Sequence, residues 1–205
     1  RFVVIGNGRM TGRKAKIIAV EPRDKYRYGY RLWLDKSSAM LLKSDVINDK
    51  GQVVEQLMFT NLTIVKNIDD SALKPEVAHK DFKVFKQLKK ARVQNAPKEW
   101  RVTRLPVGYK MKMYTTHDMR TSKMPVDHFV YTDGLSIVSV YIEKPSPDKS
   151  KQKGENRFLI GATSMGAINA YGREVAGYQI TVVGEVPKAS VMLIGRSVEY
   201  IGSRK

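Results

Sequence analysis

Two stretches decide the fold: residues 128–145, HFVYTDGLSIVSVYIEKP, and residues 161–187, GATSMGAINAYGREVAGYQITVVGEVP. In the first, Asp133-Gly134 separates two runs of β-branched and aromatic residues, which is a strong signal of a β-hairpin. The second continues the pattern with further short strands, each bounded by glycine or alanine-glycine pairs. We therefore expect a compact antiparallel sheet in this half of the chain.

The C-terminal end of this half is expected to be helical. Val191, Ile194 and Val198 follow Pro187 at helical spacing, and proline is favoured in the first turn of a helix. Gly195 weakens that expectation, because glycine lowers helix propensity. Residues 99–205 are thus predicted to form a small β-rich domain with a terminal helix.

Residues 1–74 are expected to be a separate β unit, built as an antiparallel meander. An alternating pattern over residues 26–34 predicts a strand with one apolar face and one wetter face. The apolar face carries Tyr26, Tyr28, Tyr30, Leu32 and Leu34, and the wetter face carries Lys25, Arg27, Gly29, Arg31 and Trp33. Residues 48–51, NDKG, predict a hairpin turn, with Gly51 at the positive-φ position.

Between these units, residues 75–98 are predicted to form a helical connector. Phe82, Phe85 and Leu88 recur at helical spacing, and Asp81 could cap the helix. Residues 94–97, QNAP, would end it.

The composition favours an anionic partner. Lys and Arg number 37 and Asp and Glu 20, which gives a formal net charge of +17. Residues 74–123 hold 14 Lys or Arg against 4 Asp or Glu, so the excess is concentrated around the connector. No cysteine is present, and no apolar run approaches the ~18 residues that span a bilayer. Residues 1–5, RFVVI, predict a strand, so we expect no signal peptide in this sequence.

The candidate motifs for catalysis or cofactor binding lack the residue spacing that these functions require. Residues 6–12, GNGRMTG, have the wrong glycine spacing for a dinucleotide fold and precede a strand-like run, so they predict a turn. Residues 161–166 lack the GxSxG spacing of a nucleophile elbow. His79, His117 and His128 are far apart and match no metal-ligand spacing. We expect no enzyme activity, no catalytic residues, no cofactor and no metal.

A resemblance covers nearly the whole chain. The segments on which it rests are residues 12–35, GRKAKIIAVEPRDKYRYGYRLWLD, residues 100–109, WRVTRLPVGY, the hairpin at 128–145, and residues 180–187, ITVVGEVP. In order and spacing these segments resemble the RseB/MucB family, periplasmic negative regulators of the sigma-E envelope stress response. The resemblance implies a half-open antiparallel barrel, similar to LolA and LolB, followed by a smaller C-terminal domain.

The first domain departs from that pattern. Judged against a domain of usual size, we expect about the first half of this domain to be absent from the sequence. We expect an exposed sheet edge and apolar face there, and either upstream residues or a chain that was cut on purpose.

The resemblance also implies a function and a location. A family member in the periplasm binds the periplasmic domain of a membrane-bound anti-sigma factor (RseA/MucA-like), shields it from regulated proteolysis, and is released by lipopolysaccharide or another acylated ligand. On this basis the candidate lipid pocket is formed by Tyr28, Tyr30, Leu32, Leu34, Leu57 and Phe59. The candidate contacts to an anion or partner are Lys83, Lys86, Lys90, Arg101 and Arg104.

Two alternatives stay open. A lipid or lipoprotein carrier of the LolA/LolB type would use the same apolar face, which could equally be ordinary core. A basic nucleic-acid-binding protein is supported by the positive charge alone, because the sequence has no aromatic stacking platform and no known nucleic-acid-binding motif. The favoured hypothesis includes no nucleic acid. Self-association as a homo-oligomer is compatible with each of these hypotheses.

Overall fold

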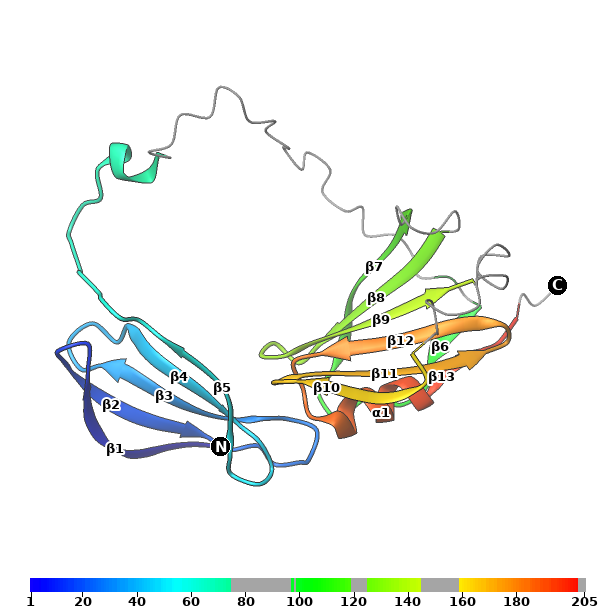
Figure 1. The fold of residues 1–205 in the computed structure, drawn as a ribbon, viewed down its shortest axis with the longest axis horizontal. Coiled ribbons are helices and arrows are strands. Elements are labelled where there is room, and N and C mark those ends of the chain that lie inside the picture. Colours follow the sequence, from blue (N-terminus) through cyan, green and yellow to red (C-terminus); the bar gives the residue numbers. More distant parts are fainter. Residues whose placement is uncertain (75–96, 98, 119–124, 145–158, 203–205) are drawn as a thin grey trace.

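The computed structural model describes residues 1–74, 97, 99–118, 125–144 and 159–202. Within these residues the chain is mainly β, with sheets of five, six and two strands and one α-helix. The predicted mainly-β class is therefore confirmed. The five-stranded sheet forms the first domain, and the other two sheets with the helix form the second (Figure 1). The predicted helical connector falls almost wholly at residues 75–96 and 98, outside the described residues.

The first domain is the expected antiparallel meander, in which each strand pairs with its neighbour in sequence. Asn48 closes the last hairpin: its Oδ1 accepts hydrogen bonds from the backbone N–H groups of Lys50 (3.0 Å) and Gln52 (2.9 Å), and Gly51 has φ +74°. A positive-φ turn at Thr11 and Gly12 joins the first two strands, but residues 6–10 of the predicted turn belong to the first strand. The strands are β1 (Phe2–Met10), β2 (Arg13–Val20), β3 (Gly29–Asp35), β4 (Leu41–Ile47) and β5 (Val53–Met58), followed by a 3-10 turn, η1 (Asp70–Leu73).

One face of the first sheet is polar. Arg13 forms an ion pair with the buried Asp35 (2.9 Å), and Lys43 lies 3.2 Å from Asp45 and over the Trp33 ring. Hydrogen bonds from Arg13 and from the Ser37 and Ser38 hydroxyls hold the pKa of Asp35 well below its usual range. The opposite face carries Ile18 of β2 and Leu32 and Leu34 of β3, whereas Ile17 and Trp33 lie on the polar face.

The second domain has a six-stranded antiparallel sheet in the order β10-β11-β12-β9-β8-β7. The pairing of β9 with β12 is the non-local one, because it joins the hairpin of residues 128–145 to the one of residues 161–187. Asp133 and Gly134 form the turn between β8 and β9, as predicted. The strands are β7 (Lys110–Asp118), β8 (Pro125–Thr132), β9 (Ile137–Glu143), β10 (Gly161–Met165), β11 (Ile168–Val175) and β12 (Tyr178–Gly184).

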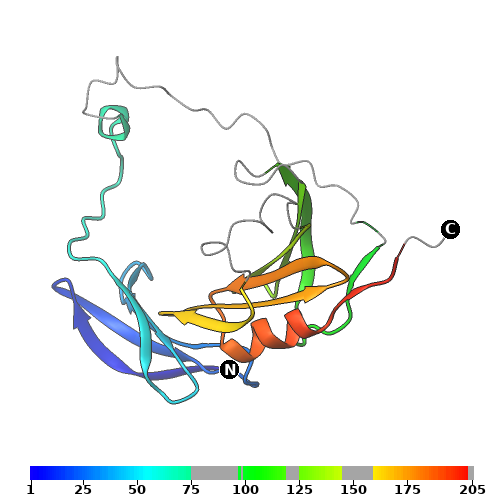
Figure 2. The ribbon, with the colours of Figure 1, turned by 45° about the vertical axis from the view of Figure 1, so that its right-hand side comes forward.

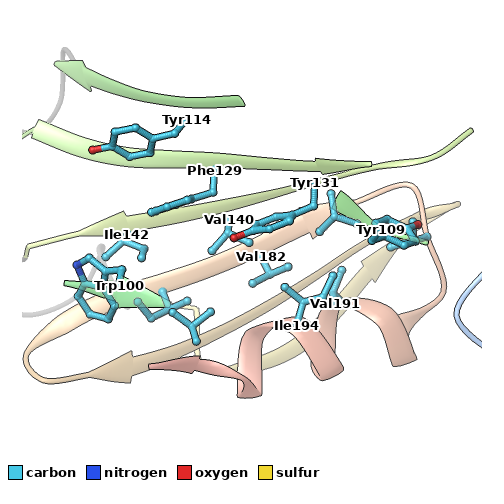
Figure 3. Close-up of a cluster of buried hydrophobic side chains, with 14 residues drawn as sticks. Trp100, Tyr109, Tyr114, Phe129, Tyr131, Val140, Ile142, Val182, Val191 and Ile194 are labelled. Atoms are coloured by element: carbon cyan, nitrogen blue, oxygen red, sulfur yellow. The ribbon is translucent and has the colours of Figure 1, made fainter. Parts of the chain in front are cut away.

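The predicted helix is α1 (Lys188–Arg196), which begins directly after Pro187 and lies along one face of the six-stranded sheet (Figures 1 and 2). It is not the last element: Val198, expected on the helix, lies in β13 (Val198–Tyr200), which pairs with β6 (Trp100–Val102). Figure 3 shows Val191 and Ile194 of α1 pointing towards the sheet side chains, and both are fully buried. The core of the second domain therefore lies between α1 and the sheet.

Gly195 is required by this packing. A Cβ at this position would lie 2.4 Å from Cδ1 of Tyr171 and 3.3 Å from a methyl group of Val182. Tyr171 and Val182 stand on β11 and β12, so the missing side chain lets the helix approach the sheet closely. The residue that weakens the helix locally is thus the one that allows it to dock.

We expect Gly195→Ala to lower the free energy of unfolding by about 1–3 kcal/mol, because overpacking outweighs a gain in helix propensity of about 1 kcal/mol. Urea unfolding followed by circular dichroism measures this. Gly6→Ala is the matched control, since its Cβ would meet nothing within 4 Å. Adding Tyr171→Leu should recover part of the loss; an unchanged loss in the double variant would contradict the steric explanation.

Candidate functional site

The two domains meet at residues 24–28, here called the junction segment, which connects β2 to β3. Asp24 begins it with a turn, in which its Oδ1 accepts a hydrogen bond from the Tyr26 N–H (2.9 Å). The Tyr26 carbonyl then accepts one from Ser190 Oγ of α1 (2.6 Å). Residues 26–28 of this segment were predicted to belong to a strand, but β3 starts only at Gly29. Its side chains are therefore free to reach the second domain.

Tyr28 is the buried centre of the junction, with 9% of its surface exposed. Its hydroxyl donates a hydrogen bond to the Ala167 carbonyl (3.0 Å) and accepts one from Asn169 Nδ2 (2.9 Å). Asn169 is itself buried and is held by Val186 O (2.8 Å) and Ser164 Oγ (2.5 Å). Burial raises the pKa of Tyr28, so the phenol stays neutral and keeps its proton for Ala167.

Arg27 makes the second connection, through charge. Its guanidinium donates to Asp133 Oδ2 (2.7 Å) in the second domain and to Asp24 Oδ2 (2.5 Å) in its own segment. It also donates to the Val107 carbonyl and lies over the Tyr109 ring, 5.2 Å from its centroid. One cation therefore serves carboxylates of both domains, a geometry in which charged hydrogen bonds are strong.

Asp133 links this ion pair to the hairpin turn. Its Oδ1 accepts hydrogen bonds from the backbone N–H groups of Leu135 (3.0 Å) and Ser136 (2.9 Å), while Oδ2 faces Arg27. Burial disfavours the charged form, but the hydrogen bonds from Ser136, Leu135 and Arg27 prevail and lower the pKa of Asp133 below 3.8. The residue predicted only as a turn former therefore also binds the other domain.

An apolar cluster completes the junction. Tyr28 and Val46 of the first domain pack with Ala167 of the second, and Tyr30 and Val54 lie against them. Burial raises the pKa of Tyr30 to about 12, and the nearby Glu185 carboxylate contributes to the shift. A hollow of about 320 Å³ borders the junction segment on the first-domain side. A second hollow, of about 520 Å³, borders it near Leu135.

The structure divides the predicted lipid pocket into two parts. Tyr28 and Tyr30 lie at the domain junction. Leu32 and Leu34 are half-buried on the same face of β3 as Tyr30, while Leu57 is 62% exposed and Phe59, beyond the end of β5, 44% exposed.

The strand register extends this apolar face across the sheet. Leu32 lies opposite Ile18, which lies opposite Val4, and on the other side Leu32 and Leu57 both lie opposite Ser44. We call Val4, Ile18, Leu32 and Leu57 the apolar strip. Val4 is 60% exposed, so the strip is open along both margins.

The predicted cationic contacts are only partly described. Lys83, Lys86 and Lys90 lie outside the described residues. Arg101 is exposed on β6 opposite Glu199, and Arg104 is exposed close to Lys25 of the junction segment. Arg27, Asp133 and Asn169 were not predicted from the sequence as contacts between the domains. An arginine within a tyrosine-rich run was the available signal for the first of them.

In the described part of the chain, no three His, Asp or Glu residues lie together in a way that could hold a metal ion. His128 stacks on the Tyr141 ring, with centroids 4.3 Å apart, and its Nε2 lies 3.0 Å from Ser139 Oγ. None of the described helices has the length and apolar character needed to cross a membrane.

Comparison with protein families matches both halves of the chain. The model of the MucB/RseB N-terminal domain matches residues 1–77, and that of the MucB/RseB C-terminal domain matches residues 94–199. The chain belongs to the MucB/RseB family. The resemblance noted in the sequence is thereby confirmed.

Relatives and solved structures agree with this assignment. The sigma factor AlgU regulatory protein MucB of Pseudomonas aeruginosa is 32% identical over 198 residues, which are 95% of this chain and 59% of the relative. The chain therefore spans about three fifths of that relative's length. A crystal structure of MucB in complex with MucA(peri) aligns with a TM-score of 0.74 at 27% identity, covering 98% of this chain and 68% of that one. A crystal structure of MucB aligns with a TM-score of 0.61 at 29% identity, covering 97% and 62%.

We expect Tyr28→Phe to weaken the junction, because the Ala167 carbonyl would lose its buried donor. A lost buried hydrogen bond of this kind costs about 1–2 kcal/mol. The midpoint of the first unfolding transition in urea should fall accordingly. Tyr141→Phe, which keeps its ring on His128, is the control; equal effects of the two variants would refute a special role for Tyr28.

The lowered pKa of Asp133 predicts a pH dependence. A carboxylate with a depressed folded-state pKa stabilises the fold above its unfolded value near 3.8, and this contribution is lost as the pH falls through the folded value. Asp133→Asn should therefore be less stable than the parent at neutral pH, and the difference should shrink in strong acid. Urea midpoints across the acid range measure it, with the exposed Asp49→Asn as control. A difference that does not change with pH would contradict the ionic link.

Proposed function

We propose that the protein is a periplasmic regulatory binding protein, without enzyme activity, that holds the periplasmic domain of a membrane-bound anti-sigma factor. Membership in the MucB/RseB family is the observation that carries this proposal. MucB of Pseudomonas aeruginosa is named a regulator of the sigma factor AlgU, and a solved MucB structure contains MucA(peri). Such binding would shield the anti-sigma factor from regulated proteolysis.

A solved MucB structure that contains a partner supports a role in partner binding. The chain aligns better with MucB in complex with MucA(peri) than with MucB described without a partner, at TM-scores of 0.74 and 0.61. The junction contacts of Arg27 and Tyr28 hold the domains in the arrangement described above. A partner that contacts both domains would be sensitive to this arrangement, because it binds only where both surfaces are in place.

The release signal in this proposal is lipopolysaccharide or another acylated ligand. The apolar strip supports it, since its outer side chains, Val4 and Leu57, are 60% and 62% exposed, and an exposed apolar patch often marks a binding site. The same strip favours the alternative of a lipid or lipoprotein carrier. The six-stranded second domain favours regulation, because a carrier needs only an apolar cavity.

Titration calorimetry tests the proposal with the full-length protein and the periplasmic segment of its own organism's anti-sigma factor. We expect a Kd of about 1 µM or tighter, which corresponds to about −8 kcal/mol. Lipopolysaccharide should abolish this binding, and the segment should resist its protease only while it is bound. Lipid binding without any binding of the segment would instead favour the carrier.

A substitution in the apolar strip separates the two ligands. Leu57→Glu should weaken lipopolysaccharide binding and leave the affinity for the anti-sigma segment unchanged. Leu73→Glu is the matched control, because Leu73 is 71% exposed and lies outside the sheet. Equal lipid binding by the parent and Leu57→Glu would remove the strip from the mechanism.

A further inference from the structure

A groove lies between the junction segment and α1, on the side of the helix that faces away from the core. Its volume is about 440 Å³, and both domains contribute to its walls. The first domain supplies Lys25 and Tyr26, and the second supplies Arg104, Met192, Leu193 and Arg196. We call this the basic groove. Its size lies in the range of sites that take a few side chains or a small ligand.

The charges of the basic groove are unbalanced. Lys25, Arg104 and Arg196 face a single carboxylate, Glu199, which accepts a hydrogen bond from Thr103 Oγ1 at 3.4 Å. Within the described chain, the ion pairs elsewhere do not involve any of these three cations. Lys25 and Arg196 lie over the rings of Tyr26 and Tyr171, at 5.7 and 5.9 Å from the centroids. The groove therefore presents a positive potential to anionic groups.

The floor of the groove is apolar. Met192 and Leu193 are half-buried on α1, whereas Val191 and Ile194 of the same helix are fully buried in the core. Methionine adapts its shape easily to different apolar partners. An occupant that matches this surface carries carboxylates at the rim and an aliphatic or aromatic side chain over the helix.

We propose that the basic groove binds an acidic segment of the protein partner, with an apolar side chain of that segment on Met192 and Leu193. This inference rests on the proposed function for the partner's origin. A peptide fits better than a lipid, because the apolar floor is short and formed by two side chains, whereas an acyl chain needs a long apolar channel. The cations also come from separate elements, which suits carboxylates spaced along a chain.

The groove is tied to the domain arrangement. Lys25 and Tyr26 reach it only because Ser190 Oγ holds the Tyr26 carbonyl at 2.6 Å and Arg27 is bound to Asp133. A segment that contacts Lys25 and Arg196 together therefore stabilises this placement of the domains. By linkage, any ligand that favours a different placement lowers the affinity of the groove for the segment.

Charge reversal in the full-length protein tests the groove. The variants are Arg104→Glu and Arg196→Glu, and Arg9→Glu, exposed on β1, is the matched control. The probes are the periplasmic segment of the anti-sigma factor, a peptide in which glutamate alternates with leucine, and the same peptide with glutamine in place of glutamate. Calorimetry at low and high salt gives the affinities. Arg196→Gln serves if the reversal at this helix end lowers the urea midpoint.

We expect each charge reversal in the groove to lower the affinity for the anti-sigma segment and for the acidic peptide about tenfold. Arg9→Glu should bind both with the affinity of the parent protein, and the glutamine peptide should bind weakly to every variant. If both variants bind the segment with unchanged affinity, the proposal that the groove binds it is contradicted, but the proposed function still stands. Failure of the parent protein to bind the segment overturns the proposed function, and the acidic peptide then decides the groove by itself. Loss of binding to anionic phospholipid vesicles, with the peptide unaffected, would make the groove a lipid headgroup site and overturn the proposal.

Discussion

The structure depends on the rule that a buried polar group must be hydrogen-bonded. Burying the Tyr28 ring between the domains removes its hydroxyl from water, and an unpaired hydroxyl there would cost as much as the ring contributes. Ala167 and Asn169 prevent this loss, and both belong to the second domain. The contact is therefore favourable only in a narrow range of domain placements, and it specifies an arrangement that apolar packing by itself would leave loose.

Arg27 acts on the same junction by a different physical means. Its guanidinium is bound by Asp24 and Asp133, and these bonds depend on pH because Asp133 must be ionised. Burial raises the pKa of that carboxyl, but hydrogen bonds from the hairpin turn and from Arg27 prevail and lower it, so the carboxyl is ionised at neutral pH and the link is formed. The neutral bonds of Tyr28 and the ionic bonds of Arg27 together join the first domain to the start of β11 and to the β8–β9 turn.

The two proposed binding surfaces differ in chemistry. The apolar strip would offer aliphatic side chains to a lipid, whereas the basic groove would offer cations around a small apolar floor. Ligands at these two places need not touch to affect one another. If they prefer different domain placements, each lowers the affinity for the other through the junction, which would explain how a lipid signal releases a protein partner.

Several features were accessible from the sequence because they depend on local pattern. Alternation predicted β3, the runs of β-branched and aromatic residues on either side of Asp133-Gly134 predicted β8 and β9, Asn48–Gly51 predicted a turn, and Pro187 with Val191 and Ile194 predicted α1. The order of short segments identified the family. Each of these signals lies within a window of one hairpin or one helix, where side-chain period and turn chemistry are decided by neighbouring residues.

The tertiary structure alone decided which side chains meet across long distances in the chain. Tyr28 and Asn169 are 141 residues apart, and Arg27 and Asp133 are 106 apart, so no local pattern could pair them. The alternation around Tyr28 predicted a continuous strand, but the chain leaves the sheet there because its side chains are stabilised by the other domain. Gly195 shows the same limit: its propensity disfavours a helix, and only the close approach of Tyr171 explains its place. Periodicity determined the elements, whereas packing between distant elements determined the junction, the basic groove and hence the proposed site.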